Sequence, residues 1–146
     1  ASCALFLLTR PYKFRGHTYM DAGLVDMIPI EQSIRQGNTK HVFISTKEEN
    51  YVRKPAPGWQ IQLAKLMYPG NKTIRENLKI RHINYQKQWQ IVKELEEQGN
   101  AIVLRPSADY GVTRYTHDKE LLGRWFDLGY EDTKNRLDMI REFMEK

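Results

Sequence analysis

The residues best suited to chemistry lie in one stretch, residues 19–30, which holds two carboxylates, Asp21 and Asp26. An aspartate on a tight turn behind a strand is placed where an enzyme presents a general base at the edge of a sheet. Gly23 predicts a turn with positive φ after Asp21, and Asp26 is placed to cap or orient the same loop. The ordinary alternative is an aspartate that bonds to its own backbone at the end of a strand. The residue types alone favour that alternative.

The other candidate nucleophiles and ligands predict no second active site. Cys3 lies in an apolar stretch without a neighbouring histidine, which is typical of an inert buried thiol. The four histidines have no metal-ligand spacing, and no glycine-rich phosphate loop occurs. We therefore expect neither a metal nor a cofactor. None of the four serines lies in a G-x-S-x-G nucleophile elbow; they are Ser2, Ser33, Ser45 and Ser107.

Two further patterns have both a structural and a functional interpretation. His117 and Asp118 are adjacent like a catalytic pair, but an aspartate that caps a helix beside a surface histidine explains them better. Basic and aromatic residues are interleaved across residues 79–93, as in a platform for single-stranded nucleic acid. A helix with one core face and one solvated basic face has the same pattern. We favour that interpretation and expect no nucleic-acid partner.

Composition limits the class of protein. The chain has 146 residues, of which 40% are hydrophobic, enough for one domain with a core. Its net charge of +5 is mildly basic and suits an anionic ligand or membrane surface as well as an ordinary solvated surface. The single cysteine excludes a disulfide within the chain and favours a reducing compartment, so we expect a cytoplasmic protein. No apolar run approaches the roughly 18–20 residues of a membrane span, and the apolar start without methionine suggests a cut chain.

The elements that position Asp21 follow from turn residues and periodicity. Alternation over residues 10–19 predicts a hairpin with strands over residues 12–14 and 18–20 and a turn near Arg15 and Gly16, so that Asp21 follows the returning strand. A short helix is expected over residues 29–36, because proline favours the first turn of a helix. Two isoleucines are expected on the core face of that helix: Ile30 and Ile34.

The rest of the chain predicts an α/β arrangement. Strands are expected over residues 41–46 and 101–106, with a weaker one over residues 112–115, and strands that alternate with helices indicate an α/β fold. Helices are expected over residues 59–68, 73–98, 118–129 and 131–146. We expect a kink or break near His82, where the apolar stripe changes phase. The expected core of the first of these helices is Leu63, Leu66 and Met67.

The stretch around Asp21 resembles the C-terminal catalytic block of patatin-like phospholipases, which are α/β acyl hydrolases with an Asp-Gly-Gly or Asp-Gly-Ala motif. The resemblance is carried by Tyr19, Asp21, Gly23, Asp26 and residues 28–30, with Ala1, Ser2, Pro11, Gly37 and residues 42–46 in agreement. Weaker similarity to the C-terminal extension of a bacterial branch of that family is carried by Arg81, His82, Tyr85, residues 102–107 and residues 122–130. Ala22 stands where that family usually has glycine, which would cost roughly 1–2 kcal/mol if the position required positive φ.

The resemblance implies the C-terminal part of a three-layer α/β/α catalytic domain over residues 1–50, followed by a small extension of helices and strands over residues 51–146. It implies a Ser-Asp dyad in which Asp21 is the catalytic base and the nucleophilic serine and oxyanion hole lie upstream of this chain. The substrate would be a lipid or another fatty-acyl ester, and peripheral membrane contact would fit the basic balance. This chain alone would be inactive. The alternative is a non-catalytic module that binds nucleic acid or protein through residues 79–93.

Overall fold

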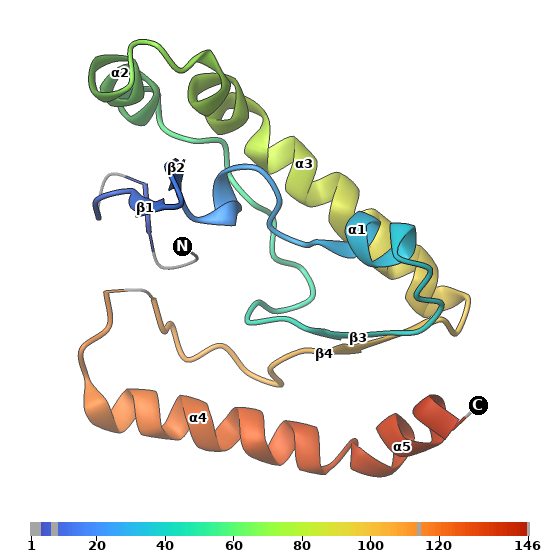
Figure 1. The fold of residues 1–146 in the computed structure, drawn as a ribbon. Coiled ribbons are helices and arrows are strands. Elements are labelled where there is room, and N and C mark those ends of the chain that lie inside the picture. Colours follow the sequence, from blue (N-terminus) through green and yellow to red (C-terminus); the bar gives the residue numbers. More distant parts are fainter. Residues whose placement is uncertain (1–3, 7–8, 114, 146) are drawn as a thin grey trace. The chain divides into compact units, whose positions relative to one another are not determined.

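The computed structural model describes residues 4–6, 9–113 and 115–145 (Figure 1). Ala1, Ser2 and Cys3 lie outside the described residues, so the interpretation of Cys3 as a buried thiol stays a prediction. The chain divides into two compact units, each built from two segments: residues 1–33 with 52–91, and residues 34–51 with 92–146. The expected division after residue 50 also stays a prediction, although the chain passes from one unit to the other close to it, after Tyr51.

The first unit begins with the expected hairpin. Strands β1 (Tyr12–Phe14) and β2 (His17–Tyr19) are antiparallel and joined by Arg15 and Gly16. Both turn residues have positive φ, 48° and 77°, as a two-residue hairpin turn of the I′ type requires. The returning strand starts at His17, one residue earlier than predicted, because this turn leaves no residue between Gly16 and the strand.

Two helices pack on the segment that follows the hairpin. Helix α2 (Gly58–Met67) and helix α3 (Lys72–Glu97) contribute Ala64, Ile74 and Leu78 to a buried cluster with Leu24. Leu63 is half-buried, but the expected core positions Leu66 and Met67 are 77% and 50% exposed. At about 100° per residue, Leu66 lies on the opposite side of α2 from the buried Ala64.

Helix α3 is continuous from Lys72 to Glu97, so the predicted break near His82 does not occur, and the alternative of a kink there stays a prediction. Its buried residues keep one face throughout, because Leu78, Gln88 and Val92 all lie within about 40° of Ile74 around the axis. Gln88 is a polar residue at a core-facing position. Counting only apolar side chains therefore made one stripe look like two.

The short helix α1 (Ile30–Arg35) forms where predicted, with Gly37 just beyond it at φ +83°. Ile30 is buried, but Ile34 is 43% exposed and does not belong to the core. A six-residue helix buries only a narrow stripe, so one isoleucine suffices to attach it.

The second unit holds a parallel pair of strands, β3 (His41–Ile44) and β4 (Ala101–Leu104), in register from His41 opposite Ala101 to Ile44 opposite Leu104. Both strands were predicted, and every residue of β4 is buried. Among the described residues of 112–115 no strand forms, and residues 111–113 have no regular structure.

Two helices complete the second unit, α4 (Lys119–Lys134) and α5 (Leu137–Glu145). The predicted boundary near Gly129 is wrong, because Gly129 is helical and the break comes at Asn135 and Arg136. A glycine that ends a helix commonly adopts positive φ, and Gly129 is not among the glycines with positive φ.

The described part of the chain is thus a mixed α/β structure with five α-helices and two small two-stranded sheets. Among the described residues, no helix is long and apolar enough to cross a bilayer. The three-layer architecture implied by the resemblance stays a prediction.

Candidate functional site

Asp21 lies on the tight turn that joins β2 to the short 3₁₀-helix η1 (Ala22–Leu24). Its Oδ1 accepts a hydrogen bond from Gly23 N at 2.8 Å, and its own N–H donates to the Ala4 carbonyl at 3.0 Å. The side chain is half-buried. The carboxylate is thus fixed at the N-terminus of η1 and still reaches solvent. This is the strand-end position that the sequence predicted.

Gly23 serves this turn in a way that the sequence did not predict. Its φ is not positive, so the expected left-handed turn is wrong. A Cβ at Gly23 would instead lie 2.7 Å from Asp21 Oδ1, closer than side-chain atoms tolerate. Glycine is therefore needed for the close approach of the carboxylate to the backbone. Ala22, in the same 3₁₀ turn, also lacks positive φ and carries no left-handed penalty.

A buried glutamine holds the loop after this turn against α3. Gln88 Nε2 donates to Asp26 Oδ1 at 2.7 Å, and Gln88 Oε1 accepts from Ile28 N at 3.2 Å. Gln88 is only 9% exposed. Asp26 thus orients the loop, as expected, through a partner 62 residues away. The signal that could have identified Gln88 is its position on the same helical face as the buried Ile74 and Leu78.

An apolar cavity of about 290 Å³ lies beside the Asp21 turn, within the same unit. Met20 and Leu24, which bracket Asp21 in sequence, line it together with Ile74 of α3. The remaining lining residues supply both apolar surface and a few amide or hydroxyl groups: Pro11, Thr18, Val25, Tyr68, Asn71, Thr73 and Asn77. Such a cavity suits an apolar group with one polar end.

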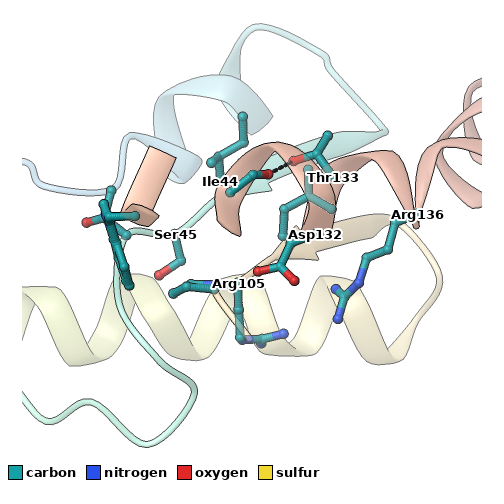
Figure 2. A pocket seen from close by; sticks show the side chains of 11 residues that line it. Ile44, Ser45, Arg105, Asp132, Thr133 and Arg136 are labelled. Atoms are coloured by element: carbon teal, nitrogen blue, oxygen red, sulfur yellow. Dashed lines mark hydrogen bonds between the residues drawn. The ribbon is translucent and has the colours of Figure 1, made fainter. Parts of the chain in front are cut away.

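A second cavity, of about 160 Å³, lies in the other unit at the carboxyl ends of β3 and β4 (Figure 2). Figure 2 shows Arg105, Asp132 and Arg136 around it. Each of these groups has a structural partner. Asp132 Oδ2 accepts from Ser107 N at 2.8 Å, and Arg136 Nη1 donates to the carbonyl of Val103 at 3.1 Å.

The side chain of Arg105 is largely enclosed, with 15% of its surface exposed. It donates two hydrogen bonds to Glu96, at 3.3 and 2.9 Å, in a bidentate pair. Ser45, which also lines the cavity, donates its hydroxyl to the carbonyl of Lys47 and accepts from the N–H of Lys47, as a turn-forming serine does. These contacts tie α3 and α4 to the strand ends and leave no serine arranged as a nucleophile here.

The remaining predicted residues have structural roles. Asp118 caps α4 by accepting from Glu120 N at 2.9 Å and Leu121 N at 3.1 Å, and His117 is exposed, so the helix-cap interpretation is confirmed. Within residues 79–93, Tyr85 and Trp89 are half-buried, as expected of a core-facing stripe. In the part of the chain that the structure describes, no group of three His, Cys, Asp or Glu residues is placed to hold a metal ion.

Residues 71–145 match the protein family described as Domain of unknown function (DUF6363). The match takes in α3, β4, α4 and α5 and does not reach Asp21. Comparison with curated proteins and with solved structures found no match for this chain. The family match covers just over half of the 146 residues, and the chain therefore belongs to the DUF6363 family, whose function its description leaves open.

Proposed function

We propose that this chain forms the C-terminal part of a patatin-like lipid acyl hydrolase, in which Asp21 is the base of a Ser-Asp dyad. The observation that carries the proposal is the geometry of Asp21. Its carboxylate sits on a turn directly behind a strand, is held by one backbone N–H through Oδ1, and is half-exposed. A base must be both fixed in position and within reach of the proton that it takes.

The second oxygen of the Asp21 carboxylate supports this role. Among the described residues, the Asp21 side chain accepts only the hydrogen bond from Gly23 N, which leaves Oδ2 for a hydroxyl donor. In the proposed reaction, that donor is a serine supplied by a segment outside these 146 residues. Asp21 takes the proton of the serine hydroxyl as its oxygen attacks the ester carbonyl, and returns the proton to the departing alcohol oxygen. A water molecule then releases the acyl group by the reverse sequence.

The surroundings of the turn support an ester with an apolar part as the substrate. The cavity of about 290 Å³ is lined in part by Met20 and Leu24, which lie on either side of Asp21 in the sequence. Its lining is mostly apolar, so burying an acyl chain there would be favourable at about 25 cal/mol per Å² of apolar surface removed from water. The hydrogen bonds of Gln88 with Asp26 and Ile28 keep this loop in place.

A fluorophosphonate probe, which reacts with activated serines, tests the dyad in the full-length parent protein. We expect the wild-type protein to be labelled and Asp21→Asn to be labelled far more slowly, since Asn cannot accept the proton. Asp26→Asn is the matched control, because it removes a carboxylate from the same loop. The Asp26 carboxylate is bound to Gln88 and is not the proposed base. Equal labelling of wild type and Asp21→Asn would contradict the proposal, as would rapid labelling of the 146-residue chain alone.

The alternative of a non-catalytic module that binds through residues 79–93 has less support. Tyr85 is half-buried and lies under the guanidinium of Arg53, with Cζ 5.6 Å from the ring centroid. Trp89 is also half-buried. Aromatic rings that stack on bases need open faces, but the Tyr85 ring is in contact with Arg53 and both rings are partly buried.

A further inference from the structure

One face of the β1–β2 hairpin carries only aromatic rings. In the register of the hairpin, Tyr12 pairs with Tyr19 and Phe14 pairs with His17. Cross-strand pairs in an antiparallel ribbon point to the same side. These four rings therefore form one surface, here called the aromatic face (Tyr12, Phe14, His17 and Tyr19). The remaining cross-strand pair points to the opposite side.

The aromatic face is exposed. Tyr12, Phe14 and Tyr19 are 53%, 49% and 42% exposed, and His17 is exposed as well. The rings contact one another along each strand: the centroids of Tyr12 and Phe14 are 6.4 Å apart and stacked, and those of His17 and Tyr19 are 6.4 Å apart and edge-to-face. Contiguous apolar surface of this kind on a folded protein marks an interaction site.

The charged residues of the hairpin segment have one sign. Residues 9–20 include Arg10, Lys13 and Arg15 and contain no Asp or Glu, and the side chain of Lys13 points to the opposite side of the ribbon. Arg15 lies with its guanidinium carbon 5.2 Å from the centroid of the Phe14 ring, which places a cation directly beside the rings. The hairpin therefore combines exposed aromatic surface with uncompensated positive charge and fits an anionic partner.

We propose that the aromatic face of the hairpin docks on the surface of an anionic lipid bilayer. Tyrosine rings are enriched at membrane–water interfaces because they have an apolar body and a polar hydroxyl, and basic side chains are attracted to anionic headgroups. A single-stranded nucleic acid would need open ring faces for its bases. In this hairpin, Tyr12 and Phe14 stack on each other, and Arg15 lies against Phe14.

This inference deepens the proposed function and rests on it for the identity of the lipid as substrate. The opposite side of the ribbon faces the apolar cavity, because Thr18, whose side chain points away from the aromatic face, lines that cavity together with Pro11. The hairpin also ends two residues before Asp21. Docking would thus bring a lipid surface to the unit that holds both the cavity and the candidate base.

Vesicle co-sedimentation with the full 146-residue chain tests the docking. The vesicles are made of phosphatidylcholine alone or of phosphatidylcholine mixed with phosphatidylserine, both as diether lipids that carry no acyl ester. We expect the chain to sediment with the mixed vesicles and only weakly with the neutral ones. The double variant Tyr12→Thr/Phe14→Thr, which keeps residues suited to strands, should bind at least about tenfold more weakly. Arg15→Gln, which removes the cation beside the Phe14 ring, should bind roughly fivefold more weakly.

The matched control is Phe126→Thr on α4, which removes a ring that is 73% exposed in the other unit. It should leave vesicle binding unchanged. The inference is overturned if neutral and anionic vesicles bind equally, or if Phe126→Thr weakens binding as much as the hairpin variant does. It is also overturned if the hairpin variant binds like wild type, or if the 146-residue chain binds a single-stranded oligonucleotide more tightly than it binds the mixed vesicles. Thermal melting of each variant shows whether the fold is retained. If the double variant has lost its fold, Arg15→Gln and the salt dependence of wild-type binding decide.

Diether lipids separate this inference from the proposed function, because binding to them requires no hydrolysis. If vesicle binding fails while Asp21→Asn abolishes serine labelling in the parent protein, the docking surface is wrong and the dyad stands. If vesicle binding depends on the aromatic face while Asp21→Asn labels normally, the dyad is wrong and the docking surface stands.

Discussion

Replacing Gly23 by alanine tests the closest contact at the Asp21 turn. An added Cβ would lie 2.7 Å from Asp21 Oδ1, so the carboxylate must rotate away and lose its 2.8 Å hydrogen bond from Gly23 N. Loss of a side-chain cap at a helix N-terminus costs about 0.5–2 kcal/mol. Alanine in place of glycine stabilises the folded protein by about 0.4–1 kcal/mol, because it restricts the unfolded chain. We therefore expect the net effect of Gly23→Ala to lie between about 0.5 kcal/mol of stabilisation and about 1.6 kcal/mol of destabilisation.

Gly123→Ala on α4 is the matched control for this change. Gly123 is helical, lacks positive φ, and has no atom within 4 Å of the position that a Cβ would take, apart from its chain neighbours and its own helix backbone. Alanine should therefore stabilise the protein there by about 0.5–1 kcal/mol. Urea denaturation of both variants measures the difference, which should equal the lost cap, about 0.5–2 kcal/mol. If Gly23→Ala stabilised the protein as much as Gly123→Ala does, the close approach of Asp21 to the backbone would not hold the turn.

Two further changes test the contacts that position this turn and α4. Gln88→Met should lower the free energy of unfolding by about 1–3 kcal/mol, because it leaves the buried N–H of Ile28 without its acceptor; urea denaturation beside Gln86→Met, at an exposed position of α3, shows whether the buried contacts cause the loss. Asp118→Ala should cost about 0.5–2 kcal/mol and reduce helicity in circular dichroism, because it removes both hydrogen bonds that cap α4. Asp127→Ala, an exposed change within α4, should have little effect, and equal losses in the two aspartate variants would argue against the cap.

Local elements were predictable where a few neighbouring residues decide the structure. The hairpin follows from Arg15 and Gly16, whose positive φ values a two-residue turn demands. Asp118 was identified as a helix cap because short polar side chains satisfy the first N–H groups of a helix. Strands β3 and β4 were predictable because each is a short apolar run in the sequence. Their pairing with each other, 60 residues apart, is a tertiary contact.

Errors arose where a distant part of the chain decides. Leu66 is apolar but faces away from the core, because Ala64 gives α2 its buried side. Gln88 interrupted the apolar stripe of α3 because its partners, Asp26 and Ile28, come from a loop about 60 residues earlier. Two compact units that each combine two segments cannot be read from composition along the chain.

The candidate site shows the same division. Asp21 could be identified from its place after the hairpin, and the structure puts it on the expected turn. The reason why residue 23 is a glycine could not be identified from the sequence. A glycine is used either for positive φ or for a close approach of another group to the backbone, and only coordinates distinguish the two. Here the close approach of Oδ1 decides.

Steady-state hydrolysis of a nitrophenyl ester by the proposed full-length hydrolase tests the proposed role of Asp21 most directly. General-base catalysis contributes about 10²–10⁴-fold to a rate, so Asp21→Asn should lower kcat by that factor while its thermal melting stays close to wild type. Asp26→Asn should retain most of the activity. An Asp21→Asn protein that turns over substrate at nearly the wild-type rate would contradict the assignment of Asp21 as the base of the dyad.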